Sequence, residues 1–189
     1  MIVIDDLLPK ILQDDIEHTF TQGEVDWKLV DFSSGPIARH FEDPDALDGP
    51  QFIHMSFHAQ DSSISDSVTK GLMMNVLWFL QKEFDFELQY LHRIKNNCTL
   101  INTNYADKHH PAHVDSHEPD MYTCAYYIND SDGDLFMFDR EGNITNRVQP
   151  KKGRCVIFKS NEFHAGTCPT LSSYRIMSNI IFKPNKDFI

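Results

Sequence analysis

The residues of this sequence best suited to chemistry are a His-Val-Asp triplet and a histidine far downstream of it. His113 and Asp115 lie two positions apart. If the triplet lies on a β-strand, both side chains point to one face and can bind the same metal ion. His164 lies in a separate β-prone segment and supplies a third candidate ligand. Two imidazoles and one carboxylate form a facial triad, which suits Fe(II) and leaves coordination positions open for oxygen chemistry.

Such a triplet also occurs by chance, so its surroundings decide how it is interpreted. In the β-prone segment that follows, Thr123, Ala125 and Tyr127 alternate onto one face. Polar groups on a face that also holds metal ligands indicate a pocket, because a plain core would be apolar there.

Arg175 is the candidate for binding an anion beside the metal. Strand alternation places Arg175, Met177 and Asn179 on one face of the last β-prone segment. If that face points inward, the buried guanidinium needs an anion, and a dicarboxylate could be held by its two parallel N–H donors. Taken alone, Arg175 fits a structural ion pair better, but the candidate metal ligands favour the dicarboxylate.

The elements that must position these residues are short and β-prone. They follow one another with turn signals and no helix between them, which favours an antiparallel sandwich or barrel of the jelly-roll type. The expected strands are Cys98–Asn104, Ala112–Asp115, Met121–Ile128, Leu135–Phe138, Ile144–Val148, Arg154–Phe158, Phe163–Thr167 and Tyr174–Phe182.

The N-terminal half is predicted to be mixed. We expect a strand at Met1–Leu7, a helix from Pro9 to Phe20, and a loop over Ser33–Pro50. A second helix is expected over Ser62–Phe84, capped by Ser65 and Asp66. Its apolar side chains recur at helical spacing and are expected to cover a sheet: Val68, Leu72, Met73, Val76, Leu77 and Leu80.

Composition narrows the function classes. The net charge of −11 and pI near 5.2 disfavour nucleic-acid binding. No stretch is long and apolar enough to span a membrane, and the two aspartates in Met1–Lys10 argue against a signal peptide. The cysteines form no CxxC pair, so we expect free thiols in a reducing, cytoplasmic compartment: Cys98, Cys124, Cys155 and Cys168.

The order and spacing of these pieces resemble a known family. From Cys98 to Phe182 the chain is similar to the Fe(II)/2-oxoglutarate-dependent dioxygenases, and within them to the prolyl hydroxylase-like branch. The pieces that carry the resemblance are Asn104-Tyr105, His113-Val114-Asp115, the run from Tyr122 to Asn129, Gly133-Asp134-Leu135, the run from Phe158 to Asn161 leading to His164, and Tyr174-Arg175.

The resemblance implies a fold and a division of the chain. The fold is mostly β with flanking N-terminal helices (α+β), and its core is a double-stranded β-helix, or jelly roll. We expect one domain over residues 1–189. Residues 1–96 would form a helical and strand support region, and residues 97–183 the catalytic core.

The resemblance also implies residue roles. His113, Asp115 and His164 match the iron ligands, and Arg175 matches the residue that pairs with the distal carboxylate of 2-oxoglutarate. Tyr127 matches a tyrosine that hydrogen-bonds the same carboxylate. The other cosubstrate-binding candidates are Leu135, Thr123 and Tyr105, although Tyr105 lies at a shorter spacing than the family pattern. One departure is Asp132, which stands where the family often has a glycine.

The implied activity is hydroxylation of an unactivated C–H bond, with release of succinate and CO2. It would use Fe(II), 2-oxoglutarate and O2, with ascorbate as a reductant. The substrate would be a prolyl residue, another amino acid or a small molecule, and neither it nor the oligomeric state can be read from the sequence. The alternatives are a cupin-like metal-binding jelly roll, a nucleic-acid demethylase of the same superfamily and a non-enzymatic binding module.

The remaining histidines near the triplet are interpreted as loop or surface residues. His117 follows His113 by four positions, but it lacks the glutamate of a metalloprotease motif and is expected in a loop. His109 and His110 are expected to face solvent, within a segment over residues 106–111 that could act as a lid.

Overall fold

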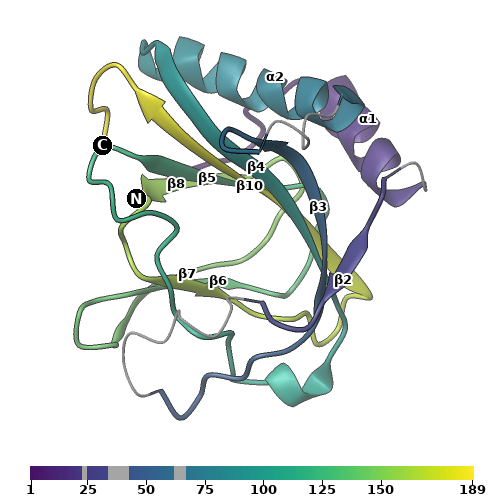
Figure 1. Ribbon diagram of the computed structural model, residues 1–189. Coiled ribbons are helices and arrows are strands. Elements are labelled where there is room, and N and C mark those ends of the chain that lie inside the picture. Colours follow the sequence, from purple (N-terminus) through teal and green to yellow (C-terminus); the bar gives the residue numbers. More distant parts are fainter. Residues whose placement is uncertain (23–24, 34–42, 62–66) are drawn as a thin grey trace.

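Two β-sheets organise residues 1–22, 25–33, 43–61 and 67–189, the part of the chain that the computed structural model describes (Figure 1). The seven-stranded sheet has the order β1-β8-β5-β10-β4-β3-β2, and the three-stranded sheet has the order β7-β6-β9. The strands of the large sheet are β1 Ile2–Ile4, β2 Lys28–Val30, β3 Gln51–His58, β4 Leu88–Leu100, β5 Tyr122–Tyr127, β8 Cys155–Lys159 and β10 Tyr174–Pro184. Those of the small sheet are β6 Leu135–Phe138, β7 Ile144–Val148 and β9 His164–Gly166.

Both helices lie on the side of the large sheet that faces away from the small sheet (Figure 1). Helix α1 spans Lys10–Thr21, with Pro9 at its N-cap, where the missing N–H of proline costs nothing. Helix α2 spans Ser67–Phe84, and the side chains of Met73, Val76, Leu77 and Leu80 are fully buried. They pack into the main core with the outward face of the sheet, as the helical spacing predicted; Val68 is the exception and is exposed.

Alternation along β10 separates this core from the inner face of the sheet. Ile176, Ile180 and Phe182 belong to the core under the helices. Met177 belongs instead to a smaller apolar cluster between the two sheets, with Tyr127 and Leu135. Because antiparallel partners share a face, strand register carries this division across to β5 and β4.

The jelly-roll prediction is confirmed, since antiparallel strands form a seven-stranded and a three-stranded sheet that face each other. β6 and β7 have the predicted bounds, and the predicted segments at β5, β8, β9 and β10 differ from the observed strands by at most two residues at either end.

Two predicted strands were wrong. Residues 112–115 form only an isolated bridge, between His113 and His164. Only Cys98–Leu100 of the predicted strand Cys98–Asn104 is extended, as the end of β4, which begins at Leu88; the 3-10 turn Thr103–Tyr105 follows. The side chain of Asn102 caps that turn by accepting a hydrogen bond from Asn104 N, and so ends the strand.

Two further strands, β2 and β3, were not predicted and complete one edge of the large sheet. Residues 34–42 of the predicted loop, and the predicted cap at Ser65 and Asp66, lie outside the described residues.

Candidate metal centre

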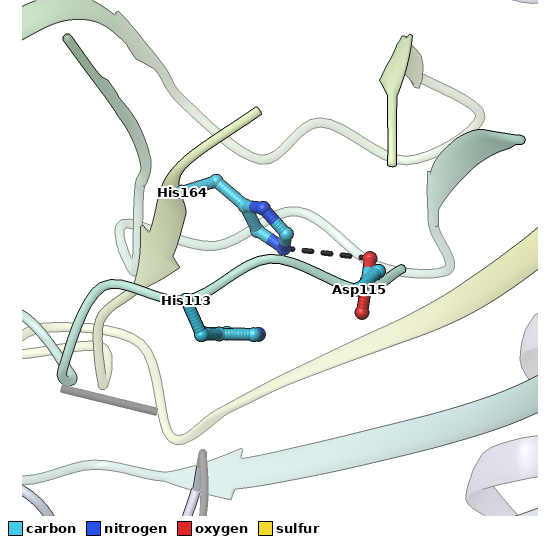
Figure 2. A group of neighbouring side chains, drawn as sticks. All are labelled: His113, Asp115 and His164. Carbon is cyan, nitrogen blue, oxygen red and sulfur yellow. Dashed lines mark ion pairs between the residues drawn. The ribbon is translucent and has the colours of Figure 1, made fainter. Parts of the chain in front are cut away.

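The structure brings His113, Asp115 and His164 together (Figure 2). One candidate ligand atom from each lies within 4.8 Å of the others, and His164 Nε2 is 3.5 Å from an oxygen of Asp115. His164 begins β9, whereas His113 and Asp115 lie in the segment before β5. The arrangement can therefore surround one ion from two separate parts of the chain.

Backbone pairing fixes the two histidines relative to each other. His113 N donates to His164 O at 2.9 Å, and His164 N donates to His113 O at 3.0 Å. Asp115 N donates to Ser160 O, which holds the other end of the triplet against the loop before β9. These bonds give the triplet the side-chain placement expected of a strand, although it has only one bridge.

Each imidazole is also oriented by a carbonyl. Nδ1 of His113 lies 3.2 Å from Pro111 O, and Nδ1 of His164 lies 3.0 Å from Glu162 O. A carbonyl only accepts, so in these bonds Nδ1 carries the proton and Nε2 presents its lone pair. Two such nitrogens and a carboxylate are donors that fit Fe(II).

Three side chains hold the Asp115 carboxylate. Thr123 Oγ1 and Asn179 Nδ2 each donate to Oδ2 at 2.9 Å, and Arg93 Nη2 donates to Oδ1 at 3.2 Å. Burial by itself would raise the pKa of Asp115, but the charges around it and these hydrogen bonds outweigh burial and hold the pKa well below its usual range. The carboxylate is therefore ionised and ready to bind a cation.

Arg175 is buried beside the same cavity, with 4% of its surface exposed. Its Nη1 donates to Gly133 O at 2.9 Å, whereas Nε has no hydrogen-bond partner among the described residues. The buried hydroxyl of Tyr127, which lines this cavity as well, also lacks a partner there. An unsatisfied guanidinium and an unsatisfied hydroxyl in one cavity fit a carboxylate ligand.

Glycines leave the space that the guanidinium occupies. A Cβ built on Gly166 would lie 2.7 Å from Nη1 of Arg175, closer than side chains pack. A Cβ on Gly133 would lie 2.7 Å from the backbone oxygen of Thr167. Gly166, at the end of β9, therefore leaves room for the guanidinium, and Gly133 lets its loop approach the backbone that follows β9.

Asp132, the departure from the family pattern, supports the turn that leads into β10. Its carboxylate accepts hydrogen bonds from the backbone N–H groups of Thr170, Leu171 and Ser172 at 2.8–2.9 Å. Burial would raise its pKa, but these bonds hold the pKa well below the usual range. The substitution thus anchors the segment immediately before Tyr174 and Arg175.

The other predicted cosubstrate residues divide into two groups. Leu135 lines the cavity together with Arg175 and Tyr127. Thr123 and Tyr105 are not among its lining residues. Thr123 instead contacts Asp115 and Ser160, while the Tyr105 hydroxyl donates to Leu47 O at 2.7 Å. The geometry thus assigns Thr123 a part in positioning a ligand and places Tyr105 beyond the cavity wall.

The prediction that His109 and His110 face solvent was wrong, because 4% and 3% of their surfaces are exposed. His110 N donates to Gly166 O, and His109 O accepts from Leu47 N. His110 also lines the cavity, where burial and the Arg175 charge lower its pKa to about 3. His109 and His110 are therefore packed between residues 45–47 and β9.

Residues of β4 were the main omission of the sequence interpretation. Lys95 and Asn97 line the cavity, and Arg93 holds Asp115. The alternation of Arg93, Lys95 and Asn97 was the available signal, because polar residues at every second position share one face of a strand.

Comparison with known proteins agrees with this geometry. Residues 100–183 match the family model described as the 2OG-Fe(II) oxygenase superfamily. Through this segment, the chain is similar to the 2OG-Fe(II) oxygenase superfamily. This match and the three candidate ligands identify the protein as an Fe(II)- and 2-oxoglutarate-dependent oxygenase.

Solved structures share the fold of this oxygenase at low sequence identity. A Pseudomonas putida prolyl-4-hydroxylase is 16% identical, with a TM-score of 0.56 over 96% of this chain and 91% of its own. A Trichoplax adhaerens prolyl hydroxylase, in complex with a hypoxia inducible factor peptide fragment, is 14% identical, with a TM-score of 0.59 over 96% and 82%. A 2OG-Fe(II) oxygenase family protein from Burkholderia pseudomallei is 11% identical, with a TM-score of 0.66 over 96% and 84%.

No curated protein shows a significant match to the oxygenase chain. Among the residues that the structure describes, no helix is both long and apolar enough to cross a membrane.

Replacing Thr123 by Val should weaken metal binding while preserving shape. The change removes one of the hydrogen bonds that orient Asp115, and losing such support typically costs about 10–100-fold in metal affinity. Anaerobic calorimetric titration with Fe(II) measures the effect. Thr21→Val on α1, whose hydroxyl donates to Glu17 O, is the matched control. Equal affinities for the two variants would contradict the role given to Thr123.

The stability of the metal-free oxygenase should fall as pH decreases below about 6.5. Removal from water lowers the pKa of His113 to about 4 and that of His110 to about 3. The unfolded chain therefore binds protons in this range while the folded chain does not. The free energy of unfolding should drop by up to about 1.4 kcal/mol per pH unit for each histidine.

Urea unfolding with chelator at several values between pH 4.5 and 6.5 measures this slope. Carboxylates such as Asp5, whose pKa is lowered to about 2 by its bond to Arg154, contribute mainly below this window. His110→Gln should remove one histidine's share, whereas His18→Gln, at an exposed position, should not. A flat profile would show that neither cavity imidazole stays neutral.

Proposed function

We propose that this oxygenase hydroxylates an unactivated C–H bond of an amino-acid-like or peptidyl substrate. In this proposal His113, Asp115 and His164 bind Fe(II), and Arg175 and Tyr127 bind the distal carboxylate of 2-oxoglutarate. The observation that carries it is the buried, unpaired donor pair of Arg175 and Tyr127 in the cavity that the three candidate ligands line.

When bound, the iron and cosubstrate would supply oxidation by O2, coupled to decarboxylation of 2-oxoglutarate to succinate and CO2. The protein's part is to hold the ligands in place. The carbonyl partners of the two imidazoles keep Nε2 free for the metal, and Thr123 and Asn179 fix the carboxylate of Asp115.

At the end of the cavity away from the candidate metal ligands, Arg175 and Tyr127 can bind the distal carboxylate of 2-oxoglutarate. Arg175 offers N–H groups in a planar fork, which matches the geometry of a carboxylate. Burial raises the pKa of Tyr127 to about 12, so its hydroxyl keeps its proton and can donate. Leu135 supplies an apolar wall beside them, which limits the access of water.

These features count against a metal-binding jelly roll without cosubstrate turnover. Such a protein would have no use for an unpaired buried guanidinium, because an unsatisfied charge in a core is strongly destabilising. The similarity to prolyl hydroxylases, one of them solved with a peptide fragment, supports a substrate with peptide-like chemistry.

The proposal is tested by reconstituting the protein anaerobically with Fe(II), 2-oxoglutarate and ascorbate, admitting air and quantifying succinate. The wild type should form succinate slowly even without a substrate. His164→Ala should form none and lose stoichiometric Fe(II) binding, whereas His18→Ala should behave as the wild type. Absence of both 2-oxoglutarate binding and succinate in the wild type would favour the metal-binding jelly roll. Normal turnover in His164→Ala would place the third ligand elsewhere.

Arg175→Met should raise the 2-oxoglutarate concentration needed for half-maximal turnover. Cutting one partner of a buried charge pair costs about 2–5 kcal/mol, so the increase should be about thirtyfold or more. Fe(II) affinity should change little, because Arg175 contacts none of the three candidate ligands through any hydrogen bond or ion pair among the described residues. Arg140→Met, at an exposed position, is the control. An unchanged requirement would move the carboxylate site away from Arg175.

A further inference from the structure

The inner face of the large sheet continues from the metal centre to the β2 edge. In the antiparallel register Lys95 of β4 lies between Asn179 of β10 and Met55 of β3. Two residues further along β4, Asn97 lies between Met177 and Ile53. Cross-strand partners share a face of a sheet. Lys95 and Asn97 therefore lie between the residues that hold Asp115 and the outer strands β3 and β2.

A second hollow adjoins the metal cavity at Lys95. Lys95 lines the metal cavity and also a groove of about 560 Å³ along β2 and β3. Leu29, Phe32 and Ile53 line that groove, and Leu29 and Phe32 are exposed. Polar residues line it as well, so the groove is a partly apolar approach to the metal cavity, with a lysine at the junction.

Lys95 has no counter-ion among the residues that the structure describes. None of the described residues forms a hydrogen bond or ion pair with its ammonium group, and Asp31, which also lines the groove, does not reach it. Other shielded lysines are paired: Lys152 contacts Asp14 and Glu17, and Lys159 contacts Asp187. Burial and the charge of Arg93 lower the pKa of Lys95 to about 8, so the group stays mostly charged at neutral pH.

The charge around the cavity points to an anionic ligand. The chain carries a net charge of −11, yet Asp115 is the one carboxylate among the described residues that line the metal cavity. Lys95 and Arg175 line the same cavity, and Arg93 contacts Asp115. Repulsion between Lys95 and Arg93 would ease if an anion lay beside Lys95.

Lys95 and Arg175 serve different ends of the cavity. Arg175 and Asn179, the partner of Lys95, are four residues apart on β10, which corresponds to about 13 Å along a strand. The charge of Lys95 acts on His113 and Asp115, so Lys95 belongs to the metal end. Arg175 therefore leaves Lys95 free for a second anion that enters from the groove.

We propose that Lys95 binds a single carboxylate of the primary substrate, whose apolar body lies in the groove over Leu29, Phe32 and Ile53. This inference rests on the proposed function and narrows its substrate class. One ammonium matches a singly charged carboxylate better than a phosphate ester, which carries nearly two charges. The buried Oδ1 of Asn97 has no partner among the described residues and can accept an N–H of the substrate. An N-acylated amino acid, or the last residue of a peptide, has this combination of groups.

The test uses the Fe(II) protein with saturating 2-oxoglutarate and matched probes. N-acetyl-leucine, N-acetyl-phenylalanine and N-acetyl-proline are each supplied as the free acid and as the carboxamide. Succinate release above the substrate-free rate and anaerobic calorimetric binding are both measured. The acids should bind and stimulate the wild type at least about tenfold better than the amides.

Lys95→Met should abolish this preference, while Lys95→Arg should keep part of it. The 2-oxoglutarate requirement of Lys95→Met should change less than about tenfold, and its Fe(II) affinity should not fall, because the change removes a positive charge near the candidate ligands. This pattern separates a substrate contact from a general defect. Lys28→Met, at an exposed position on β2, is the charge-matched control and should retain the preference. Circular dichroism checks that each variant is folded.

The inference is overturned if amides perform as well as acids, if Lys95→Met keeps the preference, or if no probe binds to a wild type that turns over 2-oxoglutarate. It is also overturned if Lys95→Met raises the 2-oxoglutarate requirement about tenfold or more, since Lys95 would then hold the cosubstrate. A wild type that neither binds nor decarboxylates 2-oxoglutarate would instead contradict the proposed function itself.

Discussion

The reciprocal backbone hydrogen bonds between His113 and His164 are the constraint on which the site depends. They join the segment before β5 to β9 of the small sheet, and they place two imidazoles with ring centroids 4.5 Å apart. Side-chain rotation alone could not hold that spacing, because each ring would be free to swing away from the other. With the backbones tied, one carbonyl per ring is enough to select the nitrogen that faces the metal.

The large sheet positions the third candidate ligand, Asp115. Its carboxylate is held by residues of three strands, Arg93 of β4, Thr123 of β5 and Asn179 of β10. These strands are hydrogen-bonded neighbours, so their relative positions are set by the sheet rather than by a loop. A site supported in this way keeps its geometry better than one carried by loops alone.

Charge is distributed unevenly between the surface and the cavity. An acidic chain concentrates cationic groups around the hollow where an iron site and a dicarboxylate are proposed to lie. The position of Arg175 is set by the close approach of Gly166 and by the turn that Asp132 anchors. Lys95, in contrast, lies in a strand and has no partner among the described residues. The first environment is closed and polar, and the second opens to an apolar groove, so two different anions can be distinguished by where they enter.

The sequence alone determined much of the site. The two-residue spacing of His113 and Asp115, and the alternation that puts Arg175 with Met177 and Asn179, follow from strand geometry and needed no coordinates. It also indicated the jelly-roll fold, because short β-prone segments with turns between them have few other ways to bury their apolar faces.

Only the tertiary structure decided the features that depend on contacts between segments far apart in the sequence. The triplet is held by one long-range bridge rather than by a strand, because its backbone partners are His164 and Ser160. His109 and His110 look solvent-facing in sequence but are buried by contacts with residues 45–47 and β9. Thr123 and Tyr105 were assigned to the cavity from the chain around them, whereas pairing between distant segments determines which walls they reach. Strand periodicity fixes the face on which a side chain lies, but long-range packing fixes what lies opposite that face.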